Sequence, residues 1–119
     1  MPRNILIFFI AVGLILGATS AMAEQIKTKK QFLGQVAGKK LVESDSWVVL
    51  SPDGTVSGQG PGNGKITGRW DWIDSYYCRE ITIDGEGFPR DCQTVTRDGK
   101  TVNFIHEMGK GITISWTIE

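Results

Sequence analysis

The chain has 119 residues, of which 13 are basic and 13 acidic, so its formal net charge is zero at neutral pH. This balance gives no reason to expect nucleic acid or an anionic membrane surface as a partner. One histidine and two cysteines are few ligands for a metal ion, and we expect no metal and no cofactor.

The first 23 residues have the three parts of a secretory signal peptide. Arg3 supplies a positive charge, residues 5–16 are apolar apart from one glycine, and Ala21-Met22-Ala23 is a small-x-small cleavage pattern. The alternative is an uncleaved membrane anchor, since residues 5–23 are just long enough to span a bilayer. We favour cleavage after Ala23. Residues 24–119 are then expected to form a single domain with one modest core, in the periplasm or outside the cell.

The two cysteines, Cys78 and Cys92, lie in a chain that we expect to be exported. In such a chain a disulfide is the default state of a cysteine pair. A metal site would need more ligands than these two thiols and His106, whose spacing is unrelated to theirs. The sequence therefore predicts one disulfide.

One short helix is predicted near the start of the mature chain. Thr28 and Gln31 have the spacing of a capping box, and the apolar residues that follow recur at helical spacing up to Gly38. Those apolar residues are Phe32, Leu33 and Val36. Glu24 to Lys27, before the helix, is expected to fray. A helix this short is marginal alone and needs a surface on which to lie.

The rest of the chain reads as short strands separated by turn residues. Pro-Asp-Gly at 52–54 and Asp-Gly at 98–99 are strong turn signals. The predicted strands are 47–50, 55–57, 65–73, 76–83, 91–96, 101–106 and 112–118. This pattern predicts a mainly β fold: a small antiparallel meander barrel or half-barrel of about seven strands, similar in outline to lipocalins. The helix would plug one end or cover the open side.

Strand alternation places three polar side chains, Arg79, Gln93 and His106, at inward-facing positions. Cys78 and Cys92 fall together on the outer face, which agrees with their pairing. The expected inward-facing apolar residues are Ile66, Trp70, Trp72, Tyr77, Ile81, Ile83, Val95, Val102, Phe104, Ile112, Ile114, Trp116 and Ile118.

The inward polar residues have two interpretations. In the first, Arg79 reaches the barrel mouth and pairs with Asp71 or Asp91, while His106 is a rim residue. In the second, the three polar groups line a pocket for a small anionic or carbonyl-bearing ligand. The candidate ligand-binding residues would then be Arg79, His106, Gln93, Trp70, Trp72 and Tyr77, with Phe104 as a further wall. We favour the first because small barrels usually fill their interior with side chains.

The sequence shows no catalytic constellation. It has neither G-x-S-x-G nor H-E-x-x-H spacing, and carboxylate pairs such as Glu80 with Glu86 fall on turns and outer faces. We therefore assign no catalytic residue. An enzyme would require His106 and Arg79 to converge on a substrate.

Five motifs together resemble a family of small exported proteins of alphaproteobacteria. They are Gly38-Lys39-Lys40-Leu41, the hairpin Asp53 to Gly58, Gly68-Arg69-Trp70-Asp71-Trp72, Tyr77-Cys78-Arg79 and Asp91-Cys92-Gln93. Some members of that family carry the label dihydrodipicolinate reductase. Enzymes of that name bind a nucleotide through G-x-G-x-x-G in a much longer chain, and this sequence has no strand–glycine–helix unit.

A weaker likeness is to secreted metalloprotease inhibitors, which are eight-stranded barrels with one disulfide. They share a G-x-W strand followed by a cysteine, here Gly68-x-Trp70 and Cys78. The likeness implies inhibition through an inserted N-terminal segment, here Glu24 to Lys27.

The function predicted from the sequence is a non-enzymatic, monomeric module that binds a small ligand or a protein partner. The alternative is a protease inhibitor or an envelope interaction protein that acts through residues 24–27 or the loop at 58–64.

Overall fold

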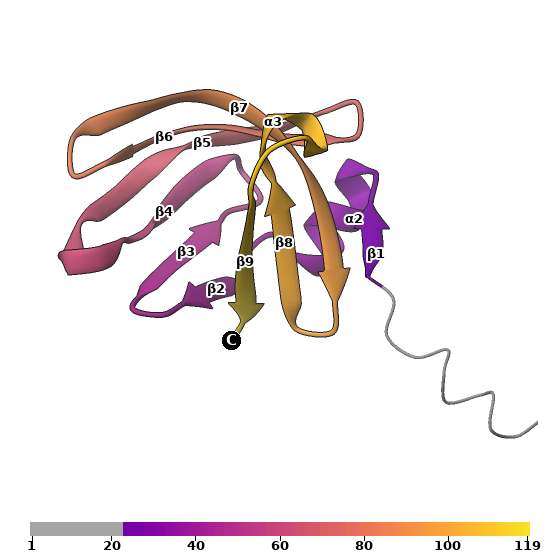
Figure 1. Cartoon of the computed structure of the whole chain (residues 1–119), viewed down its shortest axis with the longest axis horizontal. Coiled ribbons are helices and arrows are strands. Elements are labelled where there is room, and N and C mark those ends of the chain that lie inside the picture. Colours follow the sequence, from indigo (N-terminus) through magenta and orange to yellow (C-terminus); the bar gives the residue numbers. More distant parts are fainter. Residues whose placement is uncertain (1–22) are drawn as a thin grey trace, which may run out of the picture.

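The computed structural model describes residues 23–119, which form a closed antiparallel β-barrel (Figure 1). Eight strands complete the ring, because β7 pairs with both β6 and β8. The barrel strands are β2 (Lys40–Glu43), β3 (Ser46–Leu50), β4 (Thr55–Gln59), β5 (Lys65–Ile73), β6 (Tyr76–Ile83), β7 (Glu86–Asp98), β8 (Thr101–Ile105) and β9 (Thr113–Ile118). The predicted small antiparallel barrel is thereby confirmed.

Within residues 23–119, three helical segments lie between the strands: α2 (Lys29–Gln35), the 3₁₀ turn η2 (Pro61–Asn63) and α3 (His106–Gly109). None of the helices in residues 23–119 has the length and apolar character needed to cross a membrane. The predicted signal peptide lies, apart from Ala23, outside the described residues.

The structure has more strands than the sequence predicted. Lys40–Glu43 is a strand of its own, β2, which pairs with β3 through a two-residue turn. Glu24–Ile26 forms β1, which pairs with residues 95–97 of β7. The prediction that this segment frays was wrong, because Ile26 is completely buried and ties it to the core.

The predicted helix is confirmed, including its capping box. The Thr28 side chain accepts a hydrogen bond from the Gln31 backbone N–H at 3.1 Å, and the Gln31 side chain accepts one from the Thr28 N–H at 3.1 Å. Two N–H groups without helical partners are thus satisfied at the helix start. Phe32 points from this helix into the barrel and is fully buried.

We expect Thr28→Ala to lower the free energy of unfolding by about 1 kcal/mol, because alanine cannot accept the Gln31 N–H. Thr28→Asp keeps an acceptor and should stay within a few tenths of a kcal/mol of the wild type. Urea unfolding of the three proteins measures the difference. Equal losses in both variants would show that the cap contributes nothing.

The strand β7 is much longer than the predicted 91–96 and continues through Pro89. The pairings Arg79↔Asp91 and Ile81↔Phe88 leave two residues of β7 opposite one of β6, which is a β-bulge. Proline lacks the N–H that a strand ladder needs, and a bulge is where a sheet tolerates it. The segment 86–90, expected to be turn and connection, is therefore strand.

The inward and outward faces follow the predicted alternation. Val95 and Val102 are completely buried, and Phe104, Trp70, Ile66 and Tyr77 are nearly so. One assignment was wrong: Ile112 is 65 % exposed, because it precedes β9 in the turn and does not enter the sheet.

The predicted disulfide joins Cys78 on β6 to Cys92 on β7, which are directly opposed in the register. Their neighbours Tyr77 and Gln93 point to the interior, so the disulfide lies on the other face of the sheet, as expected. Cys78 is nevertheless fully buried.

The ring closes at a narrow seam between β2 and β9. Only Leu41↔Ile118 and Val42↔Thr117 are paired there, supplemented by a 2.9 Å hydrogen bond from the Glu119 N–H to the Lys40 carbonyl. By contrast, β5 and β6 are paired along eight residue positions.

Candidate functional site

The barrel interior contains a cavity of about 190 Å³. Its walls come from seven of the eight barrel strands and the first residue of α3, and they are mainly aliphatic and aromatic. The lining residues are Val48, Leu50, Val56, Ile66, Tyr77, Arg79, Ile81, Ile83, Gln93, Phe104, His106, Ile114 and Trp116. The lining residues of β3, β4 and β8 are buried. Six others are partly exposed and mark the mouth: Arg79, Ile81, Ile83, His106, Ile114 and Trp116.

The other end of the barrel is closed by α2 (Figure 1). The Phe32 ring lies 5.0 Å from the Trp70 ring, 5.1 Å from the Trp72 ring and 5.5 Å from the Tyr77 ring, measured between centroids. These contacts fill the interior beneath the helix. They also hold Trp70 and Trp72 away from the cavity wall.

The predicted ligand-binding residues therefore divide into two groups. Arg79, Gln93, His106 and Tyr77 line one cavity together, and the further wall residue Phe104 joins them. Trp70 and Trp72 belong instead to the aromatic cluster around α2. Trp116, which was expected inside the barrel but not in the site, also lines the cavity.

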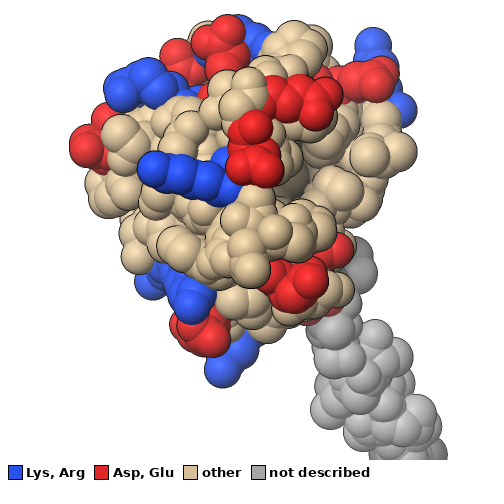
Figure 2. Space-filling view, turned by 90° about the vertical axis from the view of Figure 1, so that its left-hand side faces the viewer, with Lys and Arg blue, Asp and Glu red and all other residues tan. Residues whose placement is uncertain are grey.

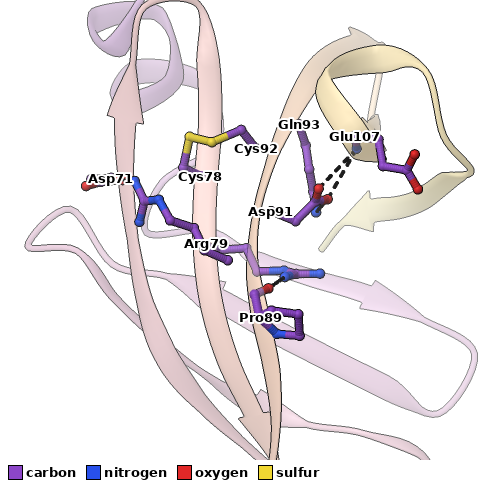
Figure 3. The surroundings of a disulfide bond; sticks show 9 residues. Asp71, Cys78, Arg79, Pro89, Asp91, Cys92, Gln93 and Glu107 are labelled. Atoms are coloured by element: carbon purple, nitrogen blue, oxygen red, sulfur yellow. Dashed lines mark hydrogen bonds and ion pairs between the residues drawn. A yellow bond between two sulfur atoms is a disulfide. The ribbon is translucent and has the colours of Figure 1, made fainter.

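Arg79 is held at the mouth by the bulge in β7. Its Nη1 donates a 2.9 Å hydrogen bond to the carbonyl oxygen of Pro89, as Figure 3 shows. The expected partners of Arg79 are engaged elsewhere: Asp71 pairs with Arg90 at 2.7 Å and Asp91 lies 3.5 Å from His106. The predicted ion pair of Arg79 with Asp71 or Asp91 was therefore wrong.

Several polar groups near the mouth contact the Asp91 carboxylate (Figure 3). The carboxylate accepts a 3.0 Å hydrogen bond from the Gln93 side-chain amide and two longer ones, 3.2 and 3.4 Å, from the Glu107 backbone N–H. The His106 Nδ1 lies 3.5 Å from the same carboxylate. Gln93, only 2 % exposed, thus has a partner for its buried amide.

The segment α3 forms an unusual rim to the cavity. Glu107 and Met108 have φ of 53° and 56°, and Gly109 follows with φ of 89°, so three successive residues are left-handed. Left-handed backbone costs roughly 1–2 kcal/mol for each residue other than glycine. The hydrogen bonds from the Glu107 N–H to Asp91 help to hold this strained turn. Met108, within the turn, is 53 % exposed.

Burial raises the pKa of the Tyr77 hydroxyl well above its usual range, and the nearby Arg79 opposes this only partly. Tyr77 is therefore protonated at neutral pH. Because Tyr77 lines the cavity, its protonated hydroxyl can donate a hydrogen bond to a bound molecule.

Charges on the end of the barrel opposite α2 are mixed in sign. Figure 2, which faces that end, shows basic and acidic side chains scattered among uncharged ones without a patch of one sign. Among residues 23–119, no three His, Cys, Asp or Glu side chains are arranged to hold a metal ion.

Comparison of the chain with protein families, with curated proteins and with solved structures finds no match in any of the three. The resemblance to exported alphaproteobacterial proteins therefore stays a prediction, and function has to be inferred from the cavity.

Proposed function

We propose that the protein is a non-enzymatic barrel that binds a small, largely apolar molecule in its interior, in the periplasm or outside the cell. The observation that carries this proposal is the cavity of about 190 Å³, which the side chains leave unfilled although α2 fills the other end. An apolar protein cavity of about 150 Å³ is large enough to bind benzene. The compartment rests on the predicted signal peptide, and the disulfide supports it.

Three features suit the cavity to binding. Its wall is mainly apolar, a few polar side chains (Tyr77, Arg79, Gln93 and His106) also line it, and the wall belongs to a closed sheet. Small-molecule sites usually combine an apolar surface with a few polar groups that fix orientation.

The same cavity gives little support to catalysis. Arg79 and His106 do line it together, and His106 lies beside Asp91 as a general base often does beside a carboxylate. However, no serine, threonine, cysteine or lysine is among the described residues that line the cavity. The Tyr77 hydroxyl, whose pKa is raised, is a poor nucleophile.

Inhibition of a protease through Glu24 to Lys27 is also less well supported. Residues 24–26 are paired with β7, and Ile26 is completely buried. Inserting this segment into a protease cleft would first require removing it from its own sheet.

Filling the cavity tests the proposal. Val48→Phe should weaken binding of octan-1-ol, an uncharged apolar probe, at least tenfold, because Val48 lines the cavity and the added ring occupies it. Val49→Phe is the matched control, since the adjacent side chain points to the other face of β3 and should leave binding unchanged. Isothermal titration calorimetry measures both.

Urea unfolding of the same variants shows whether the larger side chain strains the core, which typically costs 1–3 kcal/mol when no space is present. A wild-type protein that binds no apolar probe, or equal binding by wild type and a folded Val48→Phe variant, would disprove the proposal.

A further inference from the structure

We propose that the ligand of this cavity is a monocarboxylate with a short apolar body, whose carboxylate binds Arg79 and whose body lies in the interior. The inference rests on the proposed function and specifies the chemical class of the ligand. Four observations support it: the donors left on Arg79, the hydrogen bonds that Asp91 makes to other groups, the mainly apolar wall and the cavity volume.

The Arg79 guanidinium has donors to spare. A guanidinium carries five N–H groups, and one of them is used by the Pro89 carbonyl. No carboxylate of residues 23–119 lies within ion-pair distance of Arg79. A positive charge at the edge of an apolar cavity gains most from an anion that binds it through two parallel hydrogen bonds, and a carboxylate has that geometry.

Asp91 is held so that its carboxylate does not pair with the Arg79 guanidinium. The register places it directly opposite Arg79, yet its carboxylate is satisfied by the Gln93 amide and the Glu107 N–H and lies beside His106. The bulge at Pro89, with its carbonyl as acceptor, holds Arg79 away from it.

The charges at the mouth limit the ligand to one negative charge. Arg79 and His106 are the basic side chains there, and the Asp91 carboxylate, which lies beside His106, is the acidic one. No lysine lines the cavity among the described residues. A phosphate dianion would bring two negative charges to one permanent cation beside the Asp91 carboxylate, whereas a monocarboxylate brings one, which the single guanidinium matches.

The volume limits the length of the apolar body. Because about 150 Å³ holds a six-carbon ring, about 190 Å³ holds roughly six to eight carbon atoms. Each methylene buried against the aliphatic wall should raise affinity about fourfold until the cavity is full. Hexanoate and octanoate are the linear acids of this size, and 3-phenylpropanoate is an aromatic equivalent.

Calorimetric titration of the full mature chain with octanoate, octan-1-ol and octylamine tests the inference. Octanoate should bind at least tenfold more tightly than octan-1-ol, and octylamine most weakly. Affinity should rise from butanoate to octanoate and then stop rising. Comparing octanoate with 3-phenylpropanoate shows whether the body is linear or aromatic, and tight binding of either supports the inference.

Arg79→Met keeps the apolar stem and removes the charge. It should weaken octanoate binding at least tenfold, the expected effect of losing a charged hydrogen-bonding partner, and weaken octan-1-ol binding much less. Arg90→Met removes the same charge from the outer face, where Arg90 pairs with Asp71, and should change neither affinity. Near-ultraviolet circular dichroism confirms that both variants are folded.

The two proposals fail in different ways. Equal binding of octanoate and octan-1-ol, with Arg79→Met affecting neither, would overturn the carboxylate assignment and leave the apolar binding function standing. Absence of binding for every probe would overturn both.

Discussion

Substituting alanine for Phe32 is expected to lower the free energy of unfolding by about 3–5 kcal/mol, the range found for buried phenylalanines. The ring is fully buried, and its centroid lies within 5.5 Å of those of Trp70, Trp72 and Tyr77. Removing it leaves a void at the closed end of the barrel and detaches α2 from its anchor. Urea unfolding followed by tryptophan fluorescence measures the loss.

The adjacent residue provides the control for this experiment. Leu33 lies on the same helix but is 37 % exposed, so Leu33→Ala should cost much less than Phe32→Ala. Similar losses in the two variants would mean that α2 is held by its whole surface, and that the aromatic cluster has no special role.

Removing the disulfide should have the second large effect. The Cys78→Ala/Cys92→Ala variant is expected to lose about 3 kcal/mol, because the bond closes a loop between residues 14 apart and restricts the unfolded chain. Small domains have margins of only about 5–15 kcal/mol, so this is a large share. Urea unfolding of the oxidised wild type and of the variant gives the value.

Reductant provides an internal check on that prediction. It should lower the stability of the wild type towards that of the double variant and leave the double variant unchanged. If the oxidised wild type and the double variant unfold at the same urea concentration, the β6–β7 pairing alone holds this hairpin and the bond contributes nothing.

Local patterns predicted most of the barrel. The capping box at Thr28, the turn residues and the alternation of apolar side chains each specify a structure within a few residues. Cys78 and Cys92 could be paired because both fall on outward positions of neighbouring strands. These features depend on neighbours in sequence or on one adjacent strand, so the chain shows them directly.

Features that depend on distant parts of the chain were missed. Glu24–Ile26 is too short and polar to suggest a strand, and it becomes one because residues 95–97 offer an open edge. The extension of β7 through Pro89 needed the bulge opposite Glu80. The left-handed turn at Glu107 and Met108 has no glycine at either position to signal it.

The sequence predicted most of the residues that line the candidate site, but only some of their contacts. Alternation alone brought Arg79, Gln93 and His106 to the interior. It could not show that Phe32 would draw Trp70 and Trp72 into the helix-end cluster, since that depends on where α2 packs. The partner of Arg79 was missed because Pro89 was not recognised as part of a strand.

The two-pair seam between β2 and β9 is the place where the barrel should open most readily. Opening it breaks fewer ladder pairings than separating β5 from β6, so fluctuations of the closed sheet concentrate there. Each opening exposes the unpaired backbone edges of β2 and β9, which lie far apart in the sequence. Such edges are the elements that two copies of a chain exchange when they interlock into a swapped dimer.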